Sequence, residues 1–125
     1  MAIQNKPAQA ILNRSHLSEM SFGDEDFEKE IIGDFLEAAP RLLQDMSQAA
    51  ESGSCKLMAM ASHTLKGSCS SLGVEQLAAT CQELEHVALA SDLADAGELI
   101  QVIGEQLDDF RALVSKAWSV ESWSI

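Results

Sequence analysis

Apolar residues recur at spacings of three and four along most of the chain, which is the period of amphipathic α-helices. The clearest stripe follows Asp24 and consists of Phe27, Ile31, Phe35, Ala38, Leu42, Met46 and Ala49. Similar stripes run through about 54–72 and 74–90, and again after residue 91. Alternating runs and Asn-Gly or Asp-Gly turns, which mark strands and hairpins, are nearly absent. The pattern therefore predicts an all-α protein.

Helix boundaries are indicated by capping and breaking residues. Asn13 or Ser15 can cap a short helix through about Met20, which Phe22-Gly23 ends. Asp24 opens the long second helix, in which Pro40 should bend the helix or leave one backbone bond open.

The later boundaries follow the same logic. The third helix spans about Ser54 to Leu72 and ends at Gly73 in a left-handed cap. The fourth spans Val74 to about Ala90, and its apolar face comprises Val74, Leu77, Ala78, Cys81, Leu84 and Ala88. Ser91 or Asp92 is expected to cap the fifth, whose stripe is Leu99, Ile103, Leu107, Phe110, Val114 and Ala117.

Four long amphipathic helices with short connections predict an antiparallel up-down four-helix bundle with a short N-terminal capping helix. The 125 residues suit one domain. We expect an N-terminal tail at 1–12, the bundle at 13–118 and a C-terminal tail at 119–125. Without a long apolar run or a basic leader, and with three unpatterned cysteines, a soluble cytoplasmic protein is expected.

The formal net charge of −12 restricts the choice of partner. An anionic surface repels nucleic-acid phosphates and anionic lipids, so neither nucleic acid nor membranes are expected partners. Only 5% of the residues are aromatic and none is tyrosine, which leaves little for base stacking. Another protein is the expected partner.

The stretch ASHTLKGSCSSLG at residues 61–73 places His63 on the outer face of its helix. At about 100° per residue, the positions that lie within about 40° of the point opposite His63 are core-facing. These positions are Met58, Ala61, Leu65, Ser68 and Leu72. Lys66 and Gly67 are surface neighbours of the imidazole, one turn further along.

Most side chains around the imidazole on the outer face are unusually small. Gly67 opens space beside the ring, and Ala59, Met60 and Ser70 complete the face. The Lys66 ammonium suits an anion placed on or beside the imidazole. Histidine is largely neutral and nucleophilic near pH 7, so the arrangement favours a phosphoryl group on a ring nitrogen.

Glu85 is expected to face His63 from the next helix. Glu85 lies 11 residues after Val74 and His63 lies 11 before it, so antiparallel helices bring the two to about the same height. A hydrogen bond from one ring nitrogen to Glu85 would fix the tautomer and leave the other nitrogen as the nucleophile.

Other site types fit the sequence less well. A di-iron bundle needs two Glu-x-x-His motifs, and only Glu83-Leu84-Glu85-His86 approaches one. Cys81 falls in the buried stripe and Cys69 borders the same core, so neither is expected to be a reactive thiolate. The sequence contains no glycine-rich phosphate loop, which a kinase would need to bind ATP. An adaptor bundle in which the histidine is incidental stays open, because an exposed histidine is usually just a solvated side chain.

Residues 61–85 resemble the histidine-containing phosphotransfer (HPt) family. The residues that match its pattern are His63, Leu65, Lys66, Gly67, Ser68, Cys69, Gly73, Leu77, Cys81, Leu84 and Glu85. The run Phe27, Glu30, Phe35, Leu36, Ala39 and Pro40 also looks similar to the opening of these domains.

The resemblance implies that His63 accepts a phosphoryl group from an aspartyl phosphate on a response-regulator receiver domain and passes it to another. It implies Lys66 as an electrostatic helper, Gly67 as clearance for docking and Glu85 as the hydrogen-bonding partner of the ring. It also implies a hybrid sensor histidine kinase as a partner, a monomer, and no metal or cofactor in this chain, because the receiver supplies Mg²⁺.

The expected docking surface surrounds His63. On the same helix it comprises Ala59, Met60, Ser70 and Ser71. Counting back from a turn at Ser52 puts Arg41 level with His63, so Glu37, Ala38 and Arg41 are added from the second helix.

Overall fold

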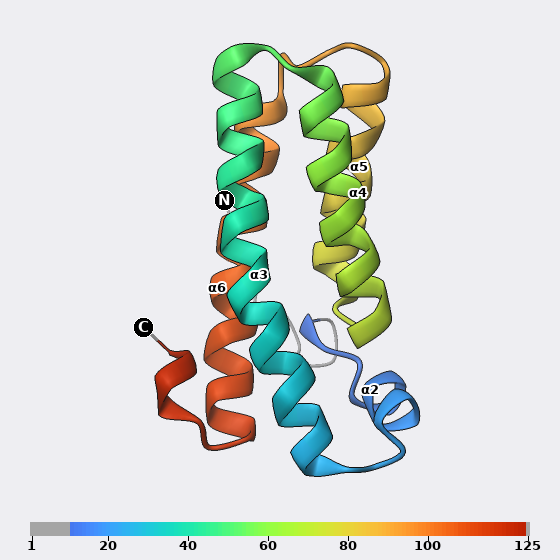
Figure 1. Cartoon of the computed structure of the whole chain (residues 1–125), viewed down its shortest axis with the longest axis vertical. Helices are drawn as coiled ribbons and strands as arrows, with labels where there is room; N and C mark the ends of the chain where they lie inside the picture. The colour runs from blue at the N-terminus through green and yellow to red at the C-terminus, as the bar shows by residue number, and fades with distance from the viewer. Residues whose placement is uncertain (1–10, 125) are drawn as a thin grey trace, which may run out of the picture.

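The computed structural model describes residues 11–124, and every regular element in that range is helical (Figure 1). The α-helices are α2 (Arg14–Ser21), α3 (Glu25–Ser52), α4 (Cys55–Leu72), α5 (Glu75–Leu89) and α6 (Ala96–Ala117), followed by the 3₁₀ turn η1 (Glu121–Trp123). The predicted all-α class is confirmed. No helix in this range is both long enough and apolar enough to cross a membrane. Most of the predicted tail at 1–12 lies outside the described residues, but Leu12 is buried in the core.

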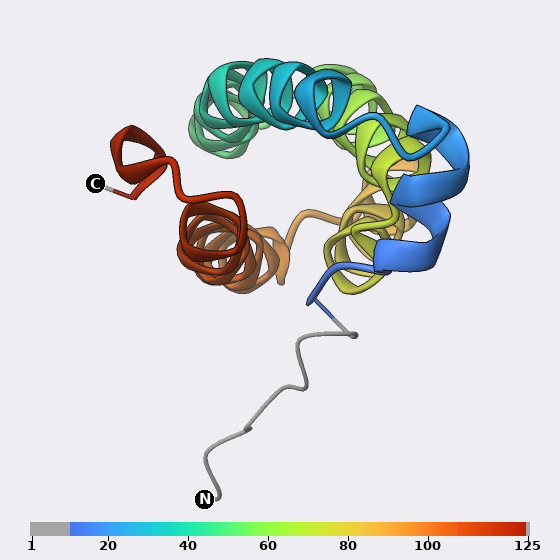
Figure 2. The ribbon, with the colours of Figure 1, turned by 90° about the horizontal axis from the view of Figure 1, so that it is seen from below.

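The four long helices lie side by side in a ring (Figure 2). α4 packs between α3 and α5, and α6 closes the ring by packing against α5 and α3. In Figure 1 the chain runs up α3, down α4, up α5 and down α6. α2 packs across α3 and α4 at one end. Each long helix therefore buries one broad face and leaves the other free.

Three helices begin at the predicted places, each with a capping side chain. The side chains of Asn13, Asp24 and Ser54 each accept a hydrogen bond, at 3.1 Å, from the backbone N–H three residues later. α3 also has Glu25, Asp26 and Glu28 in its first turn, where carboxylates favour the helix dipole.

The predicted start of the last helix at Ser91 or Asp92 is wrong, because α6 begins at Ala96. Ser91 adopts a left-handed conformation with φ 57°, which an α-helix does not accept. The Asp92 side chain accepts a hydrogen bond from the Ala94 N–H and so stabilises a turn rather than a helix.

The predicted stripe of α3 is partly wrong. Phe27 and Ala38 are exposed, whereas Ile32, Leu36 and Ala39 are buried. α3 has a neighbour on each side in the ring, so its buried face is wider than one stripe and centred about one residue later. In α6, Ala117 is likewise exposed, because the helix ends there and Trp118 is buried instead.

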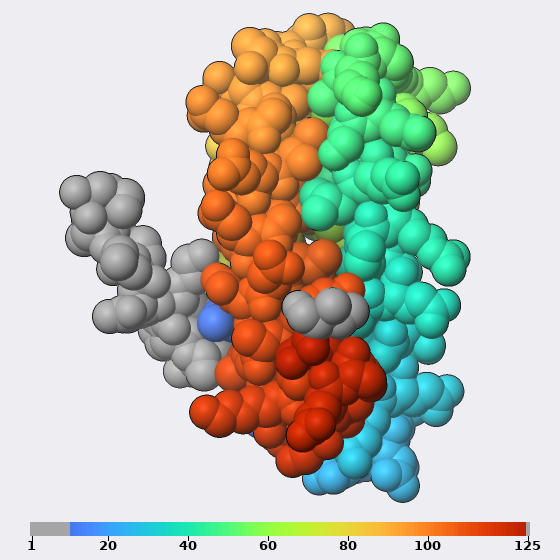
Figure 3. All heavy atoms as spheres, turned by 90° about the vertical axis from the view of Figure 1, so that its left-hand side faces the viewer, coloured from blue at the N-terminus to red at the C-terminus, as the bar shows by residue number. Residues whose placement is uncertain are grey.

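Pro40 does not interrupt α3, but its ring nitrogen has no hydrogen to donate to the Leu36 carbonyl. The Arg111 guanidinium of α6 supplies the missing donor at 3.0 Å, and its other nitrogen donates to the Trp123 carbonyl at 3.3 Å. One side chain thus satisfies the open bond in α3 and holds η1. Figure 3 shows this C-terminal segment lying over the lower part of the face between α6 and α3.

The turn between α4 and α5 depends on Gly73. Its φ of 90° lies in the left-handed region, and its N–H donates to the Cys69 carbonyl at 3.0 Å. Its carbonyl accepts a hydrogen bond from the Asn13 N–H at 2.8 Å. A Cβ here would lie 3.0 Å from the Asn13 oxygen and 3.2 Å from the His16 Cβ. The turn therefore needs glycine for its conformation and again for the close approach of α2.

Gly73→Ala should lower the free energy of unfolding by more than Gly53→Ala. Both glycines have a positive φ, where an alanine costs about 1 kcal/mol, but only at Gly73 would the new methyl group collide with another segment. We expect a further loss of about 1–3 kcal/mol from that overlap. Urea denaturation of the two variants measures the difference. Equal losses would mean that the contact with α2 imposes no constraint.

Candidate functional site

His63 lies on the outer face of α4, with its side chain 68% exposed. On the opposite face Met58, Ala61, Leu65 and Leu72 are buried, as the helical geometry predicts. Ser68 is only half-buried, while Ser62 and Cys69 are also buried. The imidazole is therefore accessible, although its helix is fixed by core contacts.

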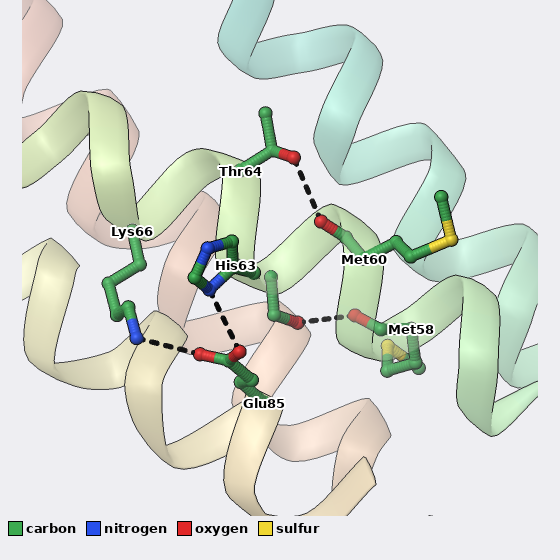
Figure 4. A network of polar contacts seen from close by, with 7 residues as sticks. Met58, Met60, His63, Thr64, Lys66 and Glu85 are labelled. Atoms are coloured by element: carbon green, nitrogen blue, oxygen red, sulfur yellow. Dashed lines mark hydrogen bonds and ion pairs between the residues drawn. The ribbon is translucent and has the colours of Figure 1, made fainter. Parts of the chain in front are cut away.

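Glu85 of α5 joins the two basic groups of the site (Figure 4). One carboxylate oxygen lies 2.9 Å from Nδ1 of His63, and the other accepts a hydrogen bond from Lys66 Nζ at 2.8 Å. The predicted contact between His63 and Glu85 is therefore present. The ion pair between Lys66 and Glu85 was not predicted, although the position of Lys66 one turn after His63 makes it accessible to the same carboxylate.

Burial within this group increases away from the imidazole. The Lys66 side chain is 28% exposed and that of Glu85 only 16%. The hydrogen bond from Lys66 is the main reason that the pKa of Glu85 lies below its usual range; partial burial opposes this effect, and the His63 contact adds to it. Glu85 is therefore an ionised hydrogen-bond acceptor at neutral pH.

The surface around the imidazole is low, meaning that most side chains next to His63 project little from α4. A Cβ added at Gly67 would meet no atom within 4 Å, so neither packing nor backbone conformation requires glycine there. Several hydroxyl groups of α4 fold back onto carbonyls of their own helix instead of projecting outward. These are the hydroxyls of Thr64, Ser68 and Ser71, which donate to the carbonyls of Met60, Thr64 and Gly67.

Met60 rises from this low surface with 57% exposure. Figure 4 shows its side chain on the side of His63 away from Lys66, towards α3. Ala59 is half-buried, whereas Ser70 and Ser71 are exposed.

The predicted α3 part of the docking surface is also exposed. Glu37, Ala38 and Arg41 all face solvent on α3, which packs against α4. Arg41 forms an exposed ion pair with Glu37 at 3.9 Å. Among the described residues, no hydrogen bond or ion pair joins these three residues to the group formed by His63, Lys66 and Glu85.

The cysteines and the remaining histidines form no second site. Cys69 and Cys81 are buried, and a hydrogen bond with Cys81 together with burial raises the pKa of the Cys69 thiol. Cys69 is therefore not a thiolate nucleophile. His86 is exposed near the end of α5. Within residues 11–124, no three His, Cys, Asp or Glu side chains are grouped so as to hold a metal ion.

Comparison with known proteins places this geometry in a family. The family model for the Hpt domain matches residues 30–113. Among solved structures, the fold is similar to the crystal structure of histidine-containing phosphotransfer protein B (HptB) from Pseudomonas aeruginosa PAO1. The TM-score is 0.82 and the identity 24%, over 87% of this chain and 95% of that chain. No curated protein sequence matches. Because the family model covers most of the chain, including α4 and α5, the chain belongs to the Hpt domain family.

Proposed function

We propose that this protein relays a phosphoryl group between aspartates of response-regulator receiver domains, through a phosphohistidine at His63, in a two-component phosphorelay. The observation that carries the proposal is the exposed imidazole of His63 with Glu85 at its Nδ1, on a chain of the Hpt domain family. The name of the structurally similar HptB agrees with this chemistry.

The carboxylate of Glu85 determines which ring nitrogen reacts. An ionised carboxylate only accepts hydrogen bonds, so Nδ1 of His63 must carry the proton that fills the 2.9 Å contact. The neutral ring then has its lone pair on Nε2. That nitrogen has no hydrogen-bond partner among the described residues and belongs to an exposed side chain. Nε2 is therefore the proposed nucleophile.

The transfer exchanges one phosphorus bond for another. Nε2 attacks the phosphorus of the aspartyl phosphate, the N–P bond forms, and the P–O bond to the receiver aspartate breaks to release its carboxylate. Because Nδ1 keeps its proton, the ring becomes cationic as the N–P bond forms. Glu85 stabilises that charge, as a carboxylate beside a catalytic imidazole does. The reverse reaction onto a second receiver uses the same groups.

Lys66 keeps Glu85 from opposing the transfer. A free carboxylate beside His63 would repel the incoming phosphoryl group, but Lys66 neutralises it at 2.8 Å. The ammonium has two further hydrogens and lies beside the ring, so it also suits the phosphoryl oxygens once they are attached.

The remaining features fit a carrier rather than a source of phosphate. We infer an up-down bundle capped by α2 over 13–118, with residues 119–125 as the C-terminal tail, acting as a cytoplasmic monomer without kinase activity or a cofactor. A hybrid sensor histidine kinase and receiver domains are the proposed partners, and the receiver supplies Mg²⁺. They dock on the surface around His63 that includes the half-buried Ala59 and the exposed Met60, Ser70, Ser71, Glu37, Ala38 and Arg41.

His63→Gln should abolish phosphoryl uptake. The protein is mixed with a panel of receiver domains phosphorylated by acetyl phosphate in the presence of Mg²⁺, and the phosphate on it is tested for stability. The wild type should acquire acid-labile, base-stable phosphate, and the control His86→Gln should behave like the wild type. An adaptor would bind partners yet acquire no phosphate from any receiver, under conditions in which a known phosphotransfer protein does.

Gly67→Ala tests whether glycine at this position serves receiver docking rather than folding. Because nothing lies within 4 Å of the added methyl group, the variant should gain about 1 kcal/mol of stability from the better helix propensity of alanine. The same methyl group should hold the receiver away from His63 and slow transfer roughly tenfold. Gly97→Ala is the matched control, because it also adds a methyl group to open space in a helix, far along the chain from His63. Unchanged transfer in Gly67→Ala would contradict the clearance role.

Glu85→Gln should make the protein less stable at pH 7 and change its pH dependence. The lowered pKa of Glu85 means that its ionised form stabilises the fold. This contribution is complete above the ordinary glutamate pKa of 4.5 and is lost as the pH falls through the lower value. The stability difference between the wild type and Glu85→Gln, measured in urea, should therefore shrink below pH 4.5.

Two comparisons sharpen this test. In a Lys66→Met background the pH dependence due to Glu85 should largely disappear, because Lys66 is its main cause. Glu85→Ala should move the neutral His63 ring away from the Nδ1–H tautomer in ¹⁵N NMR spectra, since the acceptor is gone. A ring that keeps the wild-type tautomer would refute the orienting role of Glu85.

A further inference from the structure

α4 differs from the other long helices in its charge. Each of the others has acidic side chains in its first turn, where they favour the helix dipole: Glu25, Asp26 and Glu28 in α3, Glu75 in α5 and Glu98 in α6. α4 has none there and carries Lys56 instead. It has no Asp or Glu along its whole length, so all 20 acidic side chains of the protein lie elsewhere.

Lys56 lies on the same outer face as His63. The separation of seven positions corresponds to a rotation within about 20° of the same direction and a distance of about 10.5 Å along the helix axis. Lys56 is exposed, and the small side chain of Ala59 lies between the two positions. The helix thus presents an acid-free strip that runs from Lys56 to the reactive imidazole.

Lys56 has no visible role in the fold. It forms no ion pair with any residue in 11–124, whereas Lys29, Arg41 and Lys66 each pair with a carboxylate. A cation in the first turn of a helix is also unfavourable, because that end of the helix dipole is positive. The lysine is therefore better explained by something that approaches from outside.

We propose that Lys56 is a partner-recognition residue, whose ammonium contacts an acidic side chain of the receiver domain docked over His63. The proposal rests on the proposed function, because it assumes that the partner brings an aspartyl phosphate. A surface that holds carboxylate and phosphate groups is anionic, and a protein with a net charge of −12 repels it from most directions. α4 itself adds no negative side chain to that repulsion, and the lysine adds an attraction that orients the encounter.

The test measures phosphoryl uptake from the receiver panel at low and high ionic strength. Lys56→Gln should lower the second-order rate about threefold to fivefold at low salt, and Lys56→Glu about tenfold. Both differences should diminish at high salt, which screens exposed charges. Because the substitutions remove an unfavourable charge from the helix start, neither should lower the melting temperature.

Lys116→Gln is the matched control. It removes the same charge from an exposed position in the last turn of α6, which does not adjoin α4 in the ring, and it should leave the rate unchanged. Equal losses in the two glutamine variants would reduce the effect to net charge and overturn the proposal, as would wild-type rates in Lys56→Gln. A wild type that takes up no phosphate from any receiver would instead overturn the proposed function, and this inference with it.

Discussion

The tight turn at Gly73 is the constraint on which the site depends. It joins α4 to α5 and, through the Asn13 N–H, attaches α2 to the same point. His63 and Glu85 lie on different helices, and their 2.9 Å contact exists only because the turn sets the register between them. One residue more or less in this turn would move Glu85 by about 1.5 Å along the axis and rotate it by about 100°. A change of that size would separate the carboxylate from the imidazole.

In the proposed transfer, the carboxylate that this register places beside His63 resolves an electrostatic conflict. Phosphoryl transfer to a histidine needs a hydrogen-bond acceptor behind the ring, yet negative charge near the ring repels the phosphoryl group. Placing Glu85 at 16% exposure, between Nδ1 of His63 and the Lys66 ammonium, satisfies both needs. The ring keeps its acceptor while the pair of Lys66 and Glu85 is neutral overall. Negative charge is also absent from the rest of α4, which contains none of the 20 acidic residues of the protein.

Local patterns predicted what is determined by local chemistry. Three features follow from residues within one or two turns: the helix starts near Asn13, Asp24 and Ser54, the left-handed end at Gly73, and the outward direction of His63. Other features depend on how the helices pack against one another in the ring, and the sequence did not predict them. The buried face of α3 could not be located from its own period, because two neighbours share it. The hydrogen bond from the Arg111 guanidinium to the Leu36 carbonyl could not be predicted either, because the two residues lie 75 positions apart in the sequence.

By local criteria alone, α4 is a poor helix. Gly67 costs about 1 kcal/mol relative to alanine, and Lys56 opposes the dipole by about 0.3–1 kcal/mol. Its hydroxyls also bond back to the helix carbonyls, which slightly destabilises a helix. Burial of Met58 and Leu65 offsets these costs, since each contributes about 1.5–3 kcal/mol. Contacts with α3 and α5 thus hold the inner face in helical form, and the residues of the outer face are not needed to keep the helix in place. Gly67 and Lys56, which both break local rules in α4, lie on that exposed outer face, where a reactive surface is expected to depart from them.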